Sequence, residues 1–475
     1  MAEEYFKLFF DDKGYPQDPT SQAAIIDTLV NSPKPVTDLW IFAYGWNNDL
    51  MSGTSTYDKW VSRMREVQKE KIKDPIYNPL FIGIYWPSKA WDSTIVKKVA
   101  NSAAPASGEA TTGGGVGEFE MGGDPSPQPV AAPSPIIDTE DKDRFVADYR
   151  PVMDPEGIYG EDYDRDFGRL YTLMALSQPP TDQEIREFIK IFKKYETPDP
   201  HADPIERENI SSVPVEVVVN QLKESQRYES FSAHDVLQKL FGVFSFWKMK
   251  GRAAIVGENG VRRFLVDVKK ALSQHDQRVR IHLLGHSFGA KLVTAAVYSA
   301  AGSRDVERPL VNTLVLLLGA FSQFSFSSAI PVEKSAPGHY VPVVEGGLVA
   351  NPVIAIYSRY DTANKYLYPL GMSLASPTNR YEIGGSDDTL ETYQLSKNRF
   401  GSIGANGAQG LEETSYRAID MPPRDQTYDW DDLTGVSCLN VDGQQFINKG
   451  GPPVGAHNDN SSYEIFYLAL TISLR

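Results

Sequence analysis

The chain has 475 residues, 41% of them hydrophobic and 23% charged, and its formal net charge is −15. A chain of this length and composition is too large for a small module and fits one large globular domain with insertions, or two domains. The acidic balance argues against non-specific binding to nucleic acid and to anionic membranes.

The single cysteine and the start of the chain limit its setting. Cys438 has no second cysteine to pair with, so no intrachain disulfide is expected, and a buried apolar role suits it better than a nucleophilic one. The first residues, Met1–Tyr5, include acidic side chains where a signal peptide needs basic ones. No apolar run reaches the roughly 18 residues of a transmembrane helix. The sequence predicts a cytoplasmic protein, with leaderless export left open.

Short apolar runs and an amphipathic helix fill residues 1–91. Three apolar runs end at turn-forming residues and predict strands: Tyr5–Phe10, Leu39–Tyr44 and Leu80–Trp86. Between the last two runs, apolar residues recur at helical spacing with charged residues between them. Residues 1–91 are therefore predicted to form the first part of an α/β core.

The alternation of strands and helices is interrupted over residues 92–250, which we interpret as an insertion. Residues 101–136 are crowded with Ala, Gly, Ser, Thr and Pro, and such a segment cannot bury enough apolar surface to offset its conformational entropy. They predict a disordered loop. A helical, cap-like segment follows, in which Thr181 opens one helix with a capping box and Ser232 can cap a second.

The sheet pattern resumes over residues 251–475, beginning with a helix whose apolar residues run from Val261 to Leu272. Four further strands are predicted, in chain order Arg278–Leu284, Thr313–Leu318, Pro352–Tyr357 and Cys438–Phe446. A Gly-rich stretch at about 371–435 precedes the last strand, and a helix at about 462–472 closes the chain. Buried strands alternating with amphipathic helices predict the α/β class, with a mostly parallel central sheet flanked by helices.

The pentapeptide Gly285–Gly289, with the sequence Gly-His-Ser-Phe-Gly, is the most informative feature of the chain. It joins a strand-like run to a helix-like run, Ala290–Ala300. In this context G-x-S-x-G is a nucleophile elbow, which holds Ser287 on a sharp turn with its hydroxyl exposed. Because Gly285 and Gly289 lack Cβ atoms, strand and helix can approach closely. The start of the helix offers N–H groups to developing negative charge.

A serine hydroxyl needs a base, and the base needs an acid to orient it. In this kind of site the order along the chain is Ser, acid, His. Only His339 and His457 follow Ser287. His457 lies after the last strand and just before the last helix, so it is the predicted base, and His339 is the weaker candidate. Packing or hydrogen-bonding roles are expected for His282 and His286. The remaining histidines are expected on the surface: His201, His234 and His275.

The predicted acid is Asp361, because it closely follows the strand that ends at Tyr357, where open α/β sheets place their sites. A helix or turn cap is its alternative role. Asp442 and Glu345 are weaker candidates for the acid. The histidines, acids and cysteine form no cluster with metal-ligand spacing, so no metal is expected.

Two backbone N–H groups are candidates to bind the oxyanion of a tetrahedral intermediate. One is the N–H of Phe288, which follows the nucleophile. The other is the N–H of Trp46, in the turn after the strand Leu39–Tyr44, where Gly45 permits the change of direction. The alternative is that Gly45 only ends the strand and Trp46 only packs.

Together, these residues resemble the α/β-hydrolase superfamily. The resemblance is to a little-characterised branch of serine hydrolases and esterases, which carries a His-Gly-aromatic-Asn-Asn turn, a later Trp-Pro-Ser strand end and G-H-S-x-G. This chain has Gly45–Asn48, Trp86–Ser88 and Gly285–Gly289 in that order. The His that precedes Gly in the family's turn is Tyr44 here, a departure in a residue that supports the loop.

The resemblance implies an eight-stranded type of sheet, an α/β-hydrolase fold, no cofactor, and a triad of Ser287, His457 and Asp361. It covers the strands of about 38–90 and 255–365 and the tail from 436, and it does not cover the insertion of roughly 92–250. The function it implies is hydrolysis of carboxylic esters, of small molecules or lipids, through an acyl-enzyme, as in a lipase-like esterase. Aromatic residues of the stretch Phe244–Trp247 are candidates to line an acyl pocket or to dock the insertion on the core.

Two alternatives stay open at this point. The first is a non-catalytic α/β-hydrolase-like protein that binds or scaffolds, which the long insertion and the Tyr44 departure would also fit. The second is an acyltransferase or amidase that uses the same three residues, because attack on the acyl group is common to all of these reactions. Substrate, oligomeric state and pathway cannot be predicted from the sequence.

Overall fold

The computed structural model describes residues 5–89, 139–154, 156–175, 180–195, 199–206, 235–302, 307–331, 336–373, 399–428, 430, 433–451 and 454–475. The segment 101–136, predicted to be a disordered loop, lies outside the described residues, as do Ser232 and His234.

One eight-stranded sheet forms the core, in the order β1-β3-β2-β4-β5-β6-β8-β7, and every adjacent pair in it is parallel. The strands are β1 (Phe6–Phe9), β2 (Asp38–Ala43), β3 (Pro79–Tyr85), β4 (Arg280–His286), β5 (Thr313–Leu317), β6 (Val353–Tyr357), β7 (Tyr416–Asp420) and β8 (Cys438–Asp442). The central strands are apolar and buried along almost their whole length, as parallel strands covered on both faces must be. The predicted α/β class and parallel sheet are confirmed.

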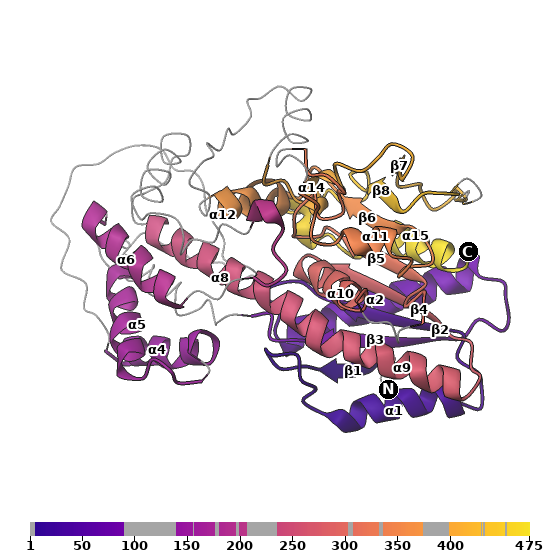
Figure 1. Cartoon of the computed structure of the whole chain (residues 1–475), viewed down its shortest axis with the longest axis horizontal. Coiled ribbons are helices and arrows are strands. Elements are labelled where there is room, and N and C mark those ends of the chain that lie inside the picture. Colours follow the sequence, from indigo (N-terminus) through magenta and orange to yellow (C-terminus); the bar gives the residue numbers. More distant parts are fainter. Residues whose placement is uncertain are drawn as a thin grey trace.

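Helices cover both faces of this sheet (Figure 1). On one side α10 packs against α8 and the segment after it, and α9 packs against α1; on the other side α2 packs against α15. The core helices are α1 (Pro19–Asn31), α2 (Leu50–Lys71), α9 (Arg262–Gln274), α10 (Phe288–Tyr298) and α15 (Tyr463–Ser473). Shorter pieces are α11 (Val341–Glu345), α12 (Tyr368–Ser373), α14 (Ile403–Asn406), the π-helical turns η2 (Gly257–Val261) and η3 (Ala363–Leu367), and the 3-10 turns η1 (Pro204–Glu206) and η4 (Gly455–Asn458).

A helical lobe beside the sheet is built within the segment interpreted as an insertion (Figure 1). It contains α4 (Thr139–Met153), α5 (Glu161–Met174), α6 (Asp182–Tyr195) and the first part of α8 (Asp235–Val256). The predicted capping box at α6 is present, because Thr181 N donates to Glu184 Oε2 at 2.7 Å and Glu184 N donates to Thr181 Oγ1 at 3.3 Å. Helix α8 continues without a break through residue 250, so one helix joins the lobe to the core.

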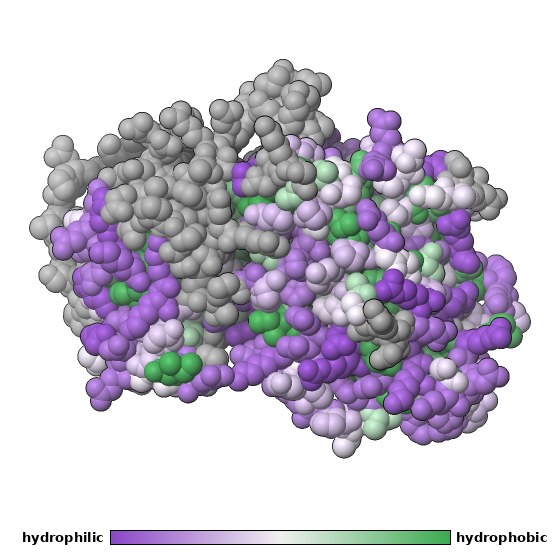
Figure 2. All heavy atoms as spheres, in the orientation of Figure 1, coloured by the Kyte–Doolittle hydropathy of each residue, from purple (hydrophilic) through white to green (hydrophobic). Residues whose placement is uncertain are grey.

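On the face drawn in Figure 2, the outer surface of the described core is mainly hydrophilic, as expected for amphipathic helices and polar loops. Apolar residues occur there in small scattered groups. None of the helices in the described residues is long and apolar enough to span a bilayer.

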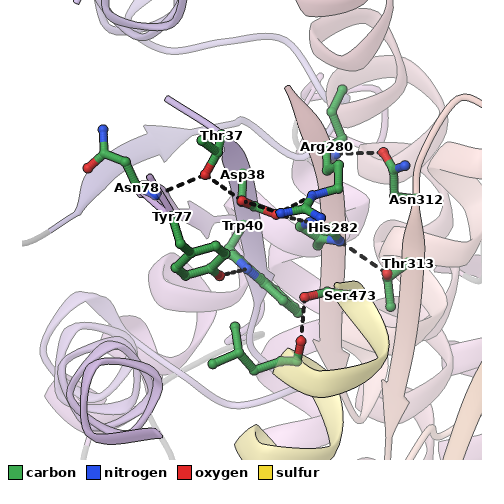
Figure 3. A network of polar contacts seen from close by, with 12 residues as sticks. Thr37, Asp38, Trp40, Tyr77, Asn78, Arg280, His282, Asn312, Thr313 and Ser473 are labelled. Atoms are coloured by element: carbon green, nitrogen blue, oxygen red, sulfur yellow. Dashed lines mark hydrogen bonds and ion pairs between the residues drawn. The ribbon is translucent and has the colours of Figure 1, made fainter. Parts of the chain in front are cut away.

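A buried polar network ties three neighbouring strands together at their amino-terminal ends (Figure 3). Asp38 of β2 accepts from His282 Nε2 at 3.0 Å and from Arg280 Nε at 2.8 Å, both on β4. His282 Nδ1 lies 3.1 Å from Thr313 Oγ1 on β5. Burial favours a neutral Asp38, but the hydrogen bonds from His282, Arg280 and Thr37 outweigh it and lower the pKa of this carboxyl. The network fixes strand register at the end of the sheet opposite Ser287, so His282 has the hydrogen-bonding role expected for it.

The structure differs from the sequence-based elements in three places. Helix α1 had no predicted counterpart, because only Ile25 and Leu29 of its residues are buried and its apolar periodicity is short. Strand β7 lies inside the Gly-rich stretch at about 371–435; four of its five residues are exposed, so the stretch has no apolar run. The last strand is shorter than the predicted Cys438–Phe446, since β8 ends at Asp442 and a hydrogen-bonded turn follows.

Candidate active site

Ser287 lies on the sharp turn between β4 and α10, with φ 57° and ψ −123°. A positive φ is uncommon for a residue with a side chain, so the surroundings must hold this turn in place. The two elbow glycines allow it. A Cβ added to Gly285 would lie 2.3 Å from the carbonyl oxygen of Gly289, and one added to Gly289 would lie 2.1 Å from that of Ala43. Strand β4, helix α10 and the end of β2 therefore meet at distances that no larger residue permits.

The structure brings together the three residues predicted to act on an acyl group. His457 Nε2 lies 2.9 Å from Ser287 Oγ, and His457 Nδ1 lies 2.8 Å from Asp361 Oδ2. The Asp361 side chain is fully buried, and that of His457 is 14% exposed. Because the carboxylate can only accept, the proton of the neutral imidazole sits on Nδ1, which leaves the lone pair of Nε2 to accept from the serine hydroxyl.

Asn364, which the sequence analysis did not single out, fixes the carboxylate. Its backbone N–H donates to Asp361 Oδ1 at 2.9 Å and its side-chain Nδ2 donates to Asp361 Oδ2 at 2.7 Å. The same Nδ2 donates to the carbonyl of Leu318 at 2.8 Å, at the end of β5. Asn364 lies three residues after the acid, a spacing shared by many unrelated turns, so only the folded arrangement identifies it.

Two backbone contacts hold the His457 loop against the neighbouring strands. Ala456 N donates to the carbonyl of Tyr360 at 2.8 Å, next to the acid. His286 Nε2 donates to the carbonyl of His457 at 2.8 Å. Burial, and then the nearby His457, lower the pKa of His286 to about 3, so this ring stays neutral and can keep donating. His286 therefore has the hydrogen-bonding role expected of it, and it links the elbow to the His457 loop.

The turn after β2 lies against Ser287. A Cβ added to Gly45 would lie 2.6 Å from Ser287 Cβ and 3.1 Å from Ser287 Oγ. In the described part of the chain, neither the backbone N–H of Trp46 nor that of Phe288 donates to another group. Both are therefore available to a negatively charged oxygen beside Ser287.

The strand end at Trp86–Ser88 braces this turn. Asn47 N donates to the carbonyl of Ser88 at 2.9 Å, and Asn48 N donates to Ser88 Oγ at 3.1 Å. Asn48 Nδ2 donates to the carbonyls of Gly45 and Trp46 at 3.1 and 3.2 Å. These bonds show that Asn47, Asn48 and Ser88 of the two motifs together hold the turn.

Tyr44 takes part in the same bracing, where the resembling family has a histidine. Its hydroxyl donates to the carbonyl of Trp86 at 3.2 Å, and the Trp86 indole N–H donates to the carbonyl of Tyr44 at 3.1 Å. Gly53 of α2 makes room for the ring, since a Cβ there would lie 2.6 Å from it. Tyr44 therefore supports the loop after β2, although the resembling family has a histidine at this position.

The weaker candidates lie outside this arrangement. His339 Nε2 bonds to His201 Nδ1 at 3.1 Å, away from Ser287. Asp442 accepts from the backbone of Gln444, and Glu345 ends α11. Cys438 is fully buried in β8, and burial raises the pKa of its thiol to about 12, which does not suit a nucleophile.

One expectation about the histidines is wrong. His201 is not on the surface; it is buried, with its Nε2 2.8 Å from Glu258 and its carbonyl accepting from Lys291 of α10 at 3.2 Å. The segment that carries it, residues 199–206, packs into the core, and nothing in its polar sequence reveals this. His275 is exposed as expected, and His234 lies outside the described residues.

The stretch Phe244–Trp247 divides between two surroundings. Phe244 stacks on Phe192 of α6 at 4.1 Å between ring centroids, which docks α8 within the helical lobe. Phe246 instead faces the candidate site, with its ring centroid 5.1 Å from that of Phe288 and 6.2 Å from that of Trp46.

Within the described residues, no group of three or more His, Cys, Asp or Glu side chains is placed to hold a metal ion. In comparisons with known proteins, no family model, curated protein or solved structure matches the chain. A serine on a strained turn, an imidazole between it and a buried carboxylate, and two unused N–H groups can together activate a hydroxyl and bind an oxyanion.

Proposed function

We propose that this protein is a serine hydrolase of the α/β-hydrolase fold that cleaves carboxylic esters through an acyl-enzyme. One observation carries the proposal: the His457 imidazole bridges Ser287 Oγ at 2.9 Å and Asp361 Oδ2 at 2.8 Å. The three side chains follow β4, β8 and β6, so they converge from separate strands at the carboxyl edge of the sheet. The eight-stranded sheet and the motif order agree with the resemblance to α/β-hydrolases.

Acylation begins when Ser287 Oγ attacks the carbonyl carbon of the ester and its proton passes to His457 Nε2. The imidazolium that forms is stabilised by the Asp361 carboxylate at Nδ1. Negative charge develops on the carbonyl oxygen, where the N–H groups of Trp46 and Phe288 receive it. As the intermediate collapses, the bond to the leaving alkoxide breaks and His457 returns its proton to that oxygen.

Deacylation repeats the cycle with water. His457 Nε2 accepts a proton from a water molecule that attacks the acyl carbon of the Ser287 ester. The acid leaves when the bond to Ser287 Oγ breaks and the proton returns to the serine. A different acceptor in place of water would give acyl transfer, and an amide substrate would follow the same steps.

Hydrolysis of p-nitrophenyl esters with acyl chains of increasing length tests the proposal, and lipid esters are assayed beside them. Ser287→Ala and His457→Ala should each lower kcat by about 10⁴-fold or more, since the triad acts as a unit. His339→Ala, at the other histidine that follows Ser287, should retain activity per folded molecule. Near-normal turnover by Ser287→Ala would refute the assignment. A folded wild type without turnover on esters, thioesters or amides would favour a binding or scaffolding role.

A further inference from the structure

We infer that Phe246 of α8 is a positioning residue for the oxyanion-binding turn and acts through the rings of Trp46 and Phe288, an inference that rests on the proposed function. Trp46 and Phe288, whose N–H groups are proposed to bind the oxyanion, also carry neighbouring aromatic rings, with centroids 6.2 Å apart. Phe246 packs on both rings at once. It is the one residue of the helical lobe segment with a ring contact to each of them among the described residues.

The three rings form a compact group. Phe246 meets Trp46 edge-to-face, with an interplanar angle of 82°, and it meets Phe288 at a centroid distance of 5.1 Å. Phe246 is 9% exposed and Phe288 is 1% exposed, whereas Trp46 is partly buried. Aromatic pairs at such distances stabilise their arrangement beyond simple burial of area.

The ring contact is important mainly for Trp46. The N–H of Phe288 is oriented by the first turn of α10, which is fixed by the elbow. The N–H of Trp46 follows Gly45, whose backbone is intrinsically free to rotate. The peptide that carries this N–H has the Gly45 carbonyl, which accepts from Asn48 Nδ2 at 3.1 Å. The packing of the Trp46 ring on Phe246 adds a second constraint, on the other side of the N–H. We therefore expect the packed Trp46 ring to limit rotation of this peptide and to keep its N–H beside Ser287.

Helix α12 and a buried ion pair support the part of α8 that carries Phe246. The Tyr368 ring packs against it at 5.5 Å, and the neighbouring Trp247 indole N–H donates to the carbonyl of Gly371 at 3.1 Å. One turn further along α8, the buried ammonium of Lys250 bonds to Glu206, and Glu206 also accepts from the Tyr368 hydroxyl. This support fixes α8 against the core, so part of the segment interpreted as an insertion belongs to the site.

Phe244 provides a matched control for Phe246. Both are buried phenylalanines on α8, two positions apart, but Phe244 stacks on Phe192 within the lobe. Each truncation to alanine should weaken the packing of α8, and only Phe246→Ala should free the ring of Trp46. The kinetic comparison of the two variants therefore separates positioning from general stability.

The experiment measures kcat and KM on a short acyl ester, together with the rate constant for phosphonylation of Ser287 by a fluorophosphonate, all per folded molecule. For Phe246→Ala we expect kcat to fall about 10- to 100-fold and KM to change by less than about threefold. This loss in kcat is smaller than the roughly 10²- to 10³-fold loss expected when one oxyanion-binding N–H is removed altogether. The phosphonylation rate should fall in parallel. Phe244→Ala should leave all three quantities within about threefold. Phe246→Leu keeps most of the side-chain volume, so its kcat should fall by about three- to tenfold, between the values for wild type and Phe246→Ala. If Phe246→Ala does not fold, the Phe246→Leu variant provides the test.

Three results would overturn the inference, and they differ from one another. Equal kcat values for Phe246→Ala and Phe244→Ala would show that Phe246 contributes only to packing. A raised KM with unchanged kcat would make it part of the acyl-binding wall instead. A folded wild type that neither reacts with the fluorophosphonate nor turns over would remove the proposed function, and this inference with it.

Discussion

Gly45→Ala places a methyl group between Ser287 and the turn that is proposed to bind the oxyanion. An added Cβ would lie 2.6 Å from Ser287 Cβ and 3.1 Å from both Ser287 Oγ and the carbonyl oxygen of His286. Rotation of the Ser287 hydroxyl cannot relieve the contacts with Ser287 Cβ and the His286 carbonyl, so the backbone of the turn or of the elbow has to move.

The size of the effect follows from that overlap. Nonbonded carbon atoms prefer separations of about 3.5–4.0 Å, so the turn and Ser287 must separate by roughly 1 Å. A misplacement of about 1 Å at a reacting centre costs about 10²-fold in rate. We therefore expect kcat/KM to fall about 100-fold, or about 2.7 kcal/mol of transition-state stabilisation.

The assay compares Gly45→Ala with a control substitution whose added Cβ makes similarly close contacts at a position outside the candidate site. At Gly260, in η2, an added Cβ would lie 2.7 Å from the carbonyl oxygen of Gly14 and 2.7 Å from the ring of Phe10. Gly260→Ala should lower the melting temperature and keep kcat/KM per folded molecule nearly unchanged. If folded Gly45→Ala kept kcat/KM within about threefold of wild type, the turn would not be part of the oxyanion site.

Two further predictions concern buried carboxyls. Asp361→Asn should lower kcat by about 10⁴-fold with little loss of fold, because the amide no longer holds the proton of His457 on Nδ1; a loss below about tenfold would contradict its role. Burial and then Glu206 raise the pKa of Asp203 from its ordinary value of 3.8 to about 6, which favours its protonated form. Its contribution to stability is complete below pH 3.8 and is lost as pH rises through about 6. Asp203→Asn should therefore stabilise the fold at pH 8 by up to about 3 kcal/mol and by less at pH 5, as thermal unfolding at both pH values would show. A pH-independent change would contradict this.

The parts of the fold and site that could be predicted are those marked by strong local patterns. Strands β2, β3, β5 and β6 are almost continuously apolar because both of their faces are buried, and the prediction found each of them. Strand β4 was also found; it is buried from Ile281 to His286 and carries two histidines among its apolar residues. Ser287, Asp361 and His457 could be selected because each follows a strand, and parallel strands end at one edge of the sheet.

The parts that could not be predicted depend on contacts between distant segments. Asn364 and His201 are polar residues in ordinary surroundings, and only the folded chain shows one on the Asp361 carboxylate and the other buried beside Glu258. Strand β7 exists through its pairing with β8 and not through apolar residues of its own. The direction in which Phe246 points is likewise set by how α8 crosses the core.

Reaction of the purified protein with a fluorophosphonate, read by peptide mass mapping, tests the central claim most directly. The account predicts a single covalent adduct on Ser287 that is absent from Ser287→Ala and strongly reduced in His457→Ala, because an activated hydroxyl requires the imidazole 2.9 Å away. An unmodified Ser287 in folded wild type, or equal labelling of the His457→Ala variant, would contradict it.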